Sequence, residues 1–151
     1  MAGRIVVGID GSEHSAEALR WAIEEGALRG ATVEAVHAWS YVPVATPADG
    51  GLVPMAWTES TDVFDATRRA AEQLAAEQVG RVAGDDHDVV VTVTQGDATD
   101  ALLDACAGAD LLVVGNRGRG SFTQALLGST SGRVSDRAPC PVVVVRAHPG
   151  D

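Results

Sequence analysis

The feature that most limits the fold is an alternation of short apolar runs with longer segments of helical spacing. The runs are rich in β-branched residues, and each is too short to form a buried helix. They are RIVVGI (4–9), TVEAVHAW (32–39), DVVVTVTQ (88–95), DLLVVG (110–115) and PVVVVR (141–146). Such runs are typical of strands that are buried on both faces of a parallel sheet. The pattern therefore predicts strands separated by helices.

Four helices are expected between these strands, over residues 12–29, 61–83, 98–107 and 129–137. Gly30 is a good stop for the first helix, and the carboxylate of Asp97 can cap the third. Ser40 to Ser60 carries three prolines and two glycines without clear periodicity. A loop of that length in a small domain is expected to be functional or mobile.

This order predicts one domain over residues 1–151, with helices on both faces of a doubly wound five-stranded parallel sheet. Right-handed crossovers favour the strand order 3-2-1-4-5, in which the winding reverses between the first and fourth strands. Ligands of open α/β sheets bind at the carboxyl ends of the strands at that reversal. The residues there are Asp10 to Ser12 and a glycine-rich segment, 115–132. We therefore expect a ligand site between these loops.

The charge of the chain excludes several functions. The net charge is −10, which disfavours nucleic acid or an anionic membrane as a partner. All 11 basic residues are arginine. The absence of lysine removes a Walker-type phosphate loop, Schiff-base chemistry and a Ser–Lys dyad. Any bound phosphate must be held by main-chain amides, hydroxyl groups and arginine.

A cytoplasmic location is expected, because no apolar run is long enough to cross a membrane and the N-terminus shows no signal-peptide pattern. Cys106 and Cys140 lie far apart in the sequence and fit no metal-ligand spacing. They are expected to be reduced core thiols.

The glycine-rich segment GNRGRGSFTQALLGSTSG allows more than one interpretation. Gly118, Gly120 and Thr123 form an incomplete dinucleotide fingerprint, too late in the chain for that motif. The spacing G-x2-G-x9-G-S remains, directly after a strand and before a helix. Glycine amides can line a concave anion nest, and a helix N-terminus with hydroxyl residues favours phosphate. The segment therefore predicts a phosphate site.

These motifs resemble those of the universal stress protein family, in its ATP-binding branch. The resemblance covers nearly the whole chain and includes VVGIDGSEHS, VHAW, ADLLVVGNRGRG and LLGSTSGRVSDRAPCPVVVVR. Gly115, Gly118, Gly128 and Ser129 match the ATP-binding signature of that family without a gap. The resemblance implies a Rossmann-like fold of the adenine nucleotide alpha hydrolase type.

The resemblance also implies a site that binds ATP, alone or with Mg²⁺ on the nucleotide. The matching positions are Gly8, Asp10, Ala38, Gly115, Asn116, Arg117, Gly118, Arg119, Gly120, Ser121, Gly128, Ser129 and Thr130. In the family, the strand-one positions contact adenine through the backbone and ribose or a metal through the aspartate, here Asp10. The position of Ala38 contacts adenine through its backbone. The loop from Gly115 surrounds ribose and phosphates, and the hydroxyls of Ser129 and Thr130 bind phosphate.

The sequence leaves several alternatives open. Asp10 could also cap the first helix or stabilise a turn, and Arg117 and Arg119 could be solvated surface charges. The family resemblance and the exposed edge of the last strand, Val142 to Arg146, favour a homodimer through that strand. The favoured function is a regulatory, ATP-binding homodimer in the stress response. The alternatives are a slow ATPase or phosphotransferase that uses the same pocket, and a structural dimer that binds no nucleotide.

Overall fold

The computed structural model describes residues 2–41, 61–117 and 127–147. Their elements are β1 (Arg4–Gly8), α1 (Glu13–Arg29), β2 (Thr32–Trp39), α2 (Thr61–Ala83), β3 (Val90–Gln95), α3 (Ala98–Ala105), β4 (Leu111–Gly115), α4 (Ser129–Arg137) and β5 (Val142–Val145). The type and order of these predicted elements are confirmed, and the ends differ by one or two residues. Most of the expected loop from Ser40 to Ser60, with Trp57, lies outside the described residues.

All pairings in the sheet are parallel, and the strand order is β3-β2-β1-β4-β5. The predicted order is thus confirmed. The central strand β1 pairs with β2 on one side and with β4 on the other, so that Val7 lies opposite both Ala35 and Val113. The winding therefore reverses at β1 and β4, as the right-handed crossover rule requires.

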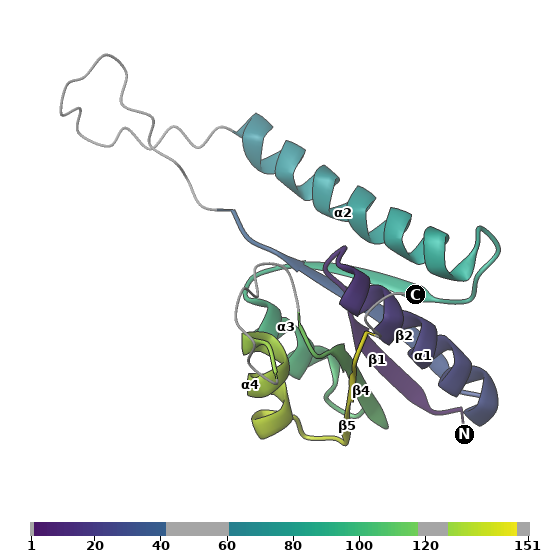
Figure 1. Ribbon diagram of the computed structural model, residues 1–151. Helices are drawn as coiled ribbons and strands as arrows, with labels where there is room; N and C mark the ends of the chain where they lie inside the picture. The colour runs from purple at the N-terminus through teal and green to yellow at the C-terminus, as the bar shows by residue number, and fades with distance from the viewer. Residues whose placement is uncertain (1, 42–60, 118–126, 148–151) are drawn as a thin grey trace, which may run out of the picture.

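Two apolar cores lie on opposite faces of the sheet, and α1 and α2 pack on a different face from α3 and α4 (Figure 1). Consecutive residues of β1 alternate between these cores. Ile5 and Val7 are buried on the face of α1 and α2, whereas Val6 is buried on the other face. This alternation follows from the period of a strand, and it explains why the strand is apolar at every position.

The ends of the helices follow from local chemistry. Gly30 adopts a left-handed conformation with φ 63° at the C-cap of α1, as its position predicted. Asp97 caps α3, because its side chain accepts hydrogen bonds from the amides of Thr99 and Asp100. At the carboxyl end of β2, the ring of Trp39 packs on Phe64 of α2, with ring centroids 5.2 Å apart. Within the described ranges, no helix has the length and apolar character of a membrane span.

Candidate functional site

The loops that follow β1 and β4 lie next to each other at the carboxyl edge of the sheet, because these strands are hydrogen-bonded neighbours. The two loops are also packed together. A Cβ atom on Gly115 would lie 2.8 Å from the carbonyl oxygen of His14, in the first turn of α1. The fold therefore brings the Asp10 loop and the start of the glycine-rich segment together, as the sequence predicted.

The β1–α1 loop is held by its own polar groups. Oδ1 of Asp10 accepts a hydrogen bond of 2.9 Å from the amide of Ser12, and the hydroxyl of Ser12 accepts one of 3.2 Å from the amide of Ser15. The hydroxyl of Ser15 accepts a hydrogen bond from the Asp10 amide. Gly11 supplies the left-handed turn, with φ 82°. Asp10 therefore stabilises the turn, whereas the N-cap of α1 is Ser12 and not Asp10.

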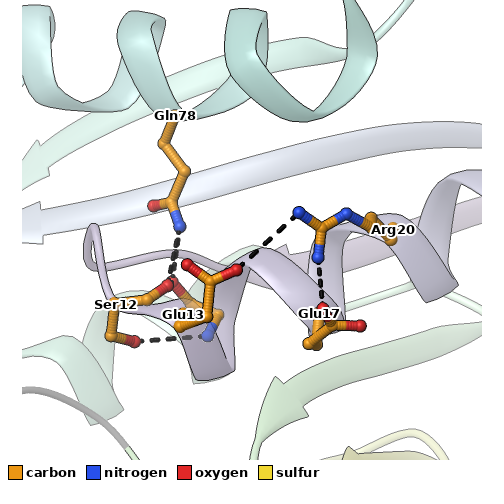
Figure 2. A network of polar contacts seen from close by, with 6 residues as sticks. Ser12, Glu13, Glu17, Arg20 and Gln78 are labelled. Atoms are coloured by element: carbon orange, nitrogen blue, oxygen red, sulfur yellow. Dashed lines mark hydrogen bonds and ion pairs between the residues drawn. The ribbon is translucent and has the colours of Figure 1, made fainter. Parts of the chain in front are cut away.

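Gln78 of α2 completes this loop, and sequence reasoning missed its role. The side chain is buried, with an exposed fraction of 3%. Its Oε1 accepts a hydrogen bond of 2.7 Å from the amide of Gly11, and its Nε2 donates to the carbonyl oxygen of Ser12 (3.1 Å) and to the hydroxyl of Ser15 (2.8 Å). Figure 2 shows Gln78 reaching from α2 to Ser12. The sequence does carry one signal for this role. An amide side chain on the buried face of a helix needs hydrogen-bond partners for its polar atoms.

The same view shows ion pairs on α1. Arg20 pairs with Glu17 and, at 3.7 Å, with Glu13 at the first position of the helix (Figure 2). Glu13 places a negative charge at the positive end of the helix dipole. The N-terminus of α1 therefore has both a hydroxyl cap from Ser12 and a carboxylate nearby.

The start of α4 is attached to the end of β4 by main-chain groups. The amide of Gly128 donates a 2.6 Å hydrogen bond to the carbonyl oxygen of Asn116. The hydroxyl of Ser131 lies 3.3 Å from that same oxygen and 3.1 Å from the carbonyl oxygen of Gly128. The first turn of α4 is thereby held against Asn116, the residue that directly follows β4.

The N-terminus of α4 differs from those of α1 and α3. Its N-cap is Gly128, which has no side-chain capping bond in the described part of the chain, and its first turn carries no acidic residue. Ser129 is exposed and Thr130 is half-buried. The free amides of a first turn and the helix dipole favour an anion. The geometry is thus compatible with the predicted phosphate role of these two residues.

Two buried polar atoms directly after β4 lack partners among the described residues: Oδ1 of Asn116 and Nε of Arg117. A buried polar group without a hydrogen bond is unfavourable, so such atoms call for a partner. The main chain of Arg117 packs against the N-cap of α4, because a Cβ atom added to Gly128 would lie 3.3 Å from the Cα atom of Arg117. Its Nε is therefore not a fully solvated surface group. The next candidates, Gly118, Arg119, Gly120 and Ser121, lie outside the described residues.

The remaining candidates, Gly8 and Ala38, lie at the carboxyl ends of β1 and β2. The amide of Ile9 donates to the carbonyl oxygen of Val36, which holds these strand ends together. A Cβ on Gly8 would lie 3.0 Å from a methyl carbon of Leu102, so α3 packs closely under this position. Gly8 and Ala38 thus lie on the same edge of the sheet as Asp10.

A cavity of about 530 Å³ occurs at the opposite edge of the sheet. It is lined by the end of α1, the start of β2 and the segment before β3, including Gly30, Thr32 and His87. It is separate from the candidate site, which lies at the carboxyl ends of the strands.

The fold and the two loops at the winding reversal define a Rossmann-like α/β protein with a loop–helix site suited to an anion. More specifically, the chain belongs to the universal stress protein family, whose family model matches residues 1–146. The resemblance noted from the motifs is thus confirmed.

Curated relatives of the chain include universal stress proteins of mycobacteria. One from Mycolicibacterium smegmatis is 35% identical over 143 residues, covering 93% of this chain and 47% of the relative. One from Mycobacterium tuberculosis is 38% identical over 144 residues, covering 94% of this chain and 45% of the relative. The chain spans about half the length of these relatives.

Solved structures of the family share the fold. UspA from Lactobacillus plantarum is 23% identical with a TM-score of 0.74, covering 95% of this chain and 97% of that chain. A universal stress protein in complex with cAMP is 26% identical with a TM-score of 0.67, and the match covers 98% of both chains. A third, from Archaeoglobus fulgidus in complex with dAMP, is 22% identical with a TM-score of 0.60 and covers 94% of this chain and 96% of that chain.

Proposed function

We propose that this protein binds ATP at the carboxyl edge of the sheet and acts as a regulatory nucleotide-binding protein in the stress response. The observation that carries the proposal is the N-terminus of α4, which has a glycine N-cap and lies against the main chain of Arg117. The Nε of Arg117 is buried and has no partner among the described residues. A main-chain amide nest and a guanidinium group are the ligands that phosphate needs in a chain without lysine. The complexes of related proteins with cAMP and dAMP support an adenine nucleotide as the ligand.

The proposed pose follows the order of the strand ends. The phosphates lie on the amides and hydroxyls of Ser129 and Thr130, and the adenine lies against the main chain of Gly8 and Ala38. Asp10 lies between them, on the loop after β1, and faces ribose or the metal. From the motif alone, Gly118, Arg119, Gly120 and Ser121 complete the phosphate loop.

Mg²⁺ fits this site through Asp10. A carboxylate oxygen is a ligand that Mg²⁺ prefers, and the ion commonly takes one or two carboxylates together with phosphate oxygens. Oδ1 of Asp10 accepts the hydrogen bond of the Ser12 amide, which fixes the orientation of the carboxylate. The bound ion would neutralise phosphate charge that the arginine residues leave uncompensated.

The proposed assembly is a homodimer through the last strand. In the described part of the sheet β5 is an edge, and Val142, Val143, Val144 and Val145 are all half-buried. Pairing this edge with a second copy would satisfy its main-chain groups and cover the valines. Light scattering should give twice the chain mass at micromolar concentration. A monomer mass under those conditions would contradict the dimer.

The direct test of ATP binding is to denature the purified protein, separate the supernatant by anion exchange and titrate the native protein with ATP in a calorimeter. We expect either co-purified adenine nucleotide or a saturable ATP signal. Absence of both would refute the proposal. Phosphate release over hours that is lost in Asp10→Ala would show the alternative, a slow ATPase.

A charge reversal at the phosphate position sharpens that test. In Ser129→Glu, a carboxylate at the start of α4 should preserve the fold, because it is favourable at a helix N-terminus, but it should repel phosphate. ATP affinity should fall by at least about tenfold, a change of about 1.4 kcal/mol. The matched control is Ser135→Glu, with the same charge in the last half of the same helix. Equal affinity in the two variants would refute the phosphate position.

A further inference from the structure

The two cysteines of the chain pack in the same apolar core, although they are far apart in the sequence. Cys106 forms the C-cap of α3 and is completely buried in the core beneath α3 and α4. Cys140 precedes β5, is half-buried and packs against the same core. Cys140 lies close enough to Cys106 to raise the pKa of its thiol. Both are free thiols in this structure.

The two thiols differ in reactivity. Burial and then the neighbouring Cys140 raise the pKa of Cys106 to about 11, against a smaller opposing effect of the charge of Arg4 on β1. Its Sγ also lies 3.4 Å from the carbonyl oxygen of Leu103, to which it donates. Because the thiolate is the nucleophile, Cys106 is protected from solutes at neutral pH. Cys140 is the thiol that a small oxidant can reach.

We propose that Cys106 and Cys140 form a reversible disulfide inside one chain when a hydroperoxide oxidises the protein. The sulfur of Cys140 first attacks one peroxide oxygen; the O–O bond breaks, and with hydrogen peroxide water leaves. The sulfur of Cys106 then attacks the sulfenic acid on Cys140. The S–S bond forms, the S–O bond breaks, and hydroxide leaves with the Cys106 proton as a second water. The two thiols supply the two electrons that reduce the peroxide, and a dithiol reductant reverses the reaction.

The proposed bond would join the end of α3 to the start of β5. The loop that it closes contains β4, the glycine-rich segment and α4, and therefore the whole phosphate half of the candidate site. A cross-link of this kind restricts the unfolded chain and raises stability when it does not strain the native state. Since both cysteines already pack in the same core of the reduced fold, we expect the oxidised protein to keep its structure and to melt at a higher temperature.

The experiment uses the whole chain, reduced with a dithiol and desalted, and then treated with equimolar hydrogen peroxide. The protein is denatured and alkylated, and its intact mass and peptide map are measured. We expect no alkylatable thiol, one peptide pair linked through Cys106 and Cys140, monomers on a non-reducing denaturing gel, and recovery of both thiols with reductant. Two alkylatable thiols after peroxide, or a bond found only between chains, would overturn the proposal.

Single variants separate the two roles. In Cys106→Ser the sulfenic acid on Cys140 should persist and be trapped by dimedone, whereas in Cys140→Ser the buried Cys106 should remain alkylatable after the same treatment. Cys106→Ala replaces the first variant if serine is not tolerated in the core. Oxidation of Cys106 in Cys140→Ser at the wild-type rate would refute Cys140 as the point of entry. These readouts follow thiols alone, so their failure would leave the ATP proposal unaffected.

The pH dependence of ring closure tests the second step. Only the thiolate of Cys106 attacks, and burial, the largest cause of its raised pKa, still disfavours the thiolate when Cys140 is a sulfenic acid. With the sulfenic acid formed beforehand, the closure rate should rise about tenfold for each pH unit between about 7 and 9. A rate that is independent of pH would contradict Cys106 as the attacking thiol.

Discussion

The loops after β1 and β4 lie next to each other, yet they are held in opposite ways. The β1–α1 loop is closed by side chains, since Asp10, Ser12, Ser15 and Gln78 bond to one another or to its main chain. The end of β4 is held to α4 largely by main-chain groups, and the described residues offer no partner to Oδ1 of Asn116. The first loop is fixed by its own bonds, whereas the second keeps polar atoms without a partner in the described part of the chain, as the proposed phosphate site requires.

This difference suggests that the two loops contribute to ligand binding in different ways. A loop whose polar groups are already bonded loses little freedom when a ligand binds, so it contributes preorganisation. A helix N-terminus without a side-chain cap contributes interaction energy, because its amides exchange water for phosphate. Four substitutions, ordered by expected effect, test whether the two loops differ in this way.

The largest effect is expected at the contact between the loops. In Gly115→Val, the added Cβ would lie 2.8 Å from the carbonyl oxygen of His14 and 2.9 Å from its carbonyl carbon. The end of β4 and the start of α1 must then separate, which should cost about 3 kcal/mol of unfolding free energy. Urea denaturation measures this loss.

The control for that substitution is Gly132→Ala in α4. Nothing lies within 4 Å of the position of its added Cβ. Because alanine has the higher helix propensity, this variant should be unchanged or more stable by up to about 1 kcal/mol. Wild-type stability in Gly115→Val would show that the two loops are not packed as described.

The second largest effect is expected at Gln78, the residue of α2 that holds the β1–α1 loop. Gln78→Ala leaves the amide of Gly11 without its partner and removes the donor to Ser12, so it should cost about 2 kcal/mol. It should also weaken ATP binding, because the loop after β1 loses its fixed shape. Urea denaturation and calorimetry measure the two changes.

Gln73→Ala is the matched control on the same helix. Gln73 is exposed and its amide donates to Glu77 one turn away, so stability should change by less than about 0.5 kcal/mol. If the Gln73 and Gln78 variants behave alike, the rigidity of the first loop does not depend on α2.

The third effect is the loss of a helix cap. Ser12→Ala removes the acceptor for the Ser15 amide and should lower the unfolding free energy by about 1 kcal/mol. Ser12→Asp should restore most of this loss, because aspartate caps helices as well as serine does. Failure of Ser12→Asp to recover stability would indicate that the hydroxyl does more than cap α1.

The smallest effect on stability is expected at the second loop. Ser129 is exposed, so Ser129→Ala should change the unfolding free energy by less than about 0.5 kcal/mol. Its ATP affinity should nevertheless fall, since the proposed phosphate contact is lost. If Ser129→Ala costs as much stability as Ser12→Ala and leaves ATP affinity unchanged, the two loops do not differ in the way described.

Much of this arrangement could be predicted from the sequence, because its signals are local. The β-branched runs and helical stripes determined the elements, and the chirality of crossovers determined the strand order. Gly30 and Asp97 were predicted as helix ends from their own backbone and side-chain chemistry. The position of Asp10 and of the glycine-rich segment at one edge followed from that order. The dimer, the nucleotide and the role of each contact residue remain predictions.

Only the tertiary structure decided which distant groups meet. Gln78 bonds to Ser12 and Ser15, which are 66 and 63 positions away along the chain. Gly115 was assigned to an anion nest from its motif, and the structure adds a second reason for glycine, its close packing on His14. The adjacency of Cys106 and Cys140 likewise has no local signature. Local patterns report how a residue relates to its own element, whereas these contacts depend on how α1, α2, α3 and β5 pack on the sheet.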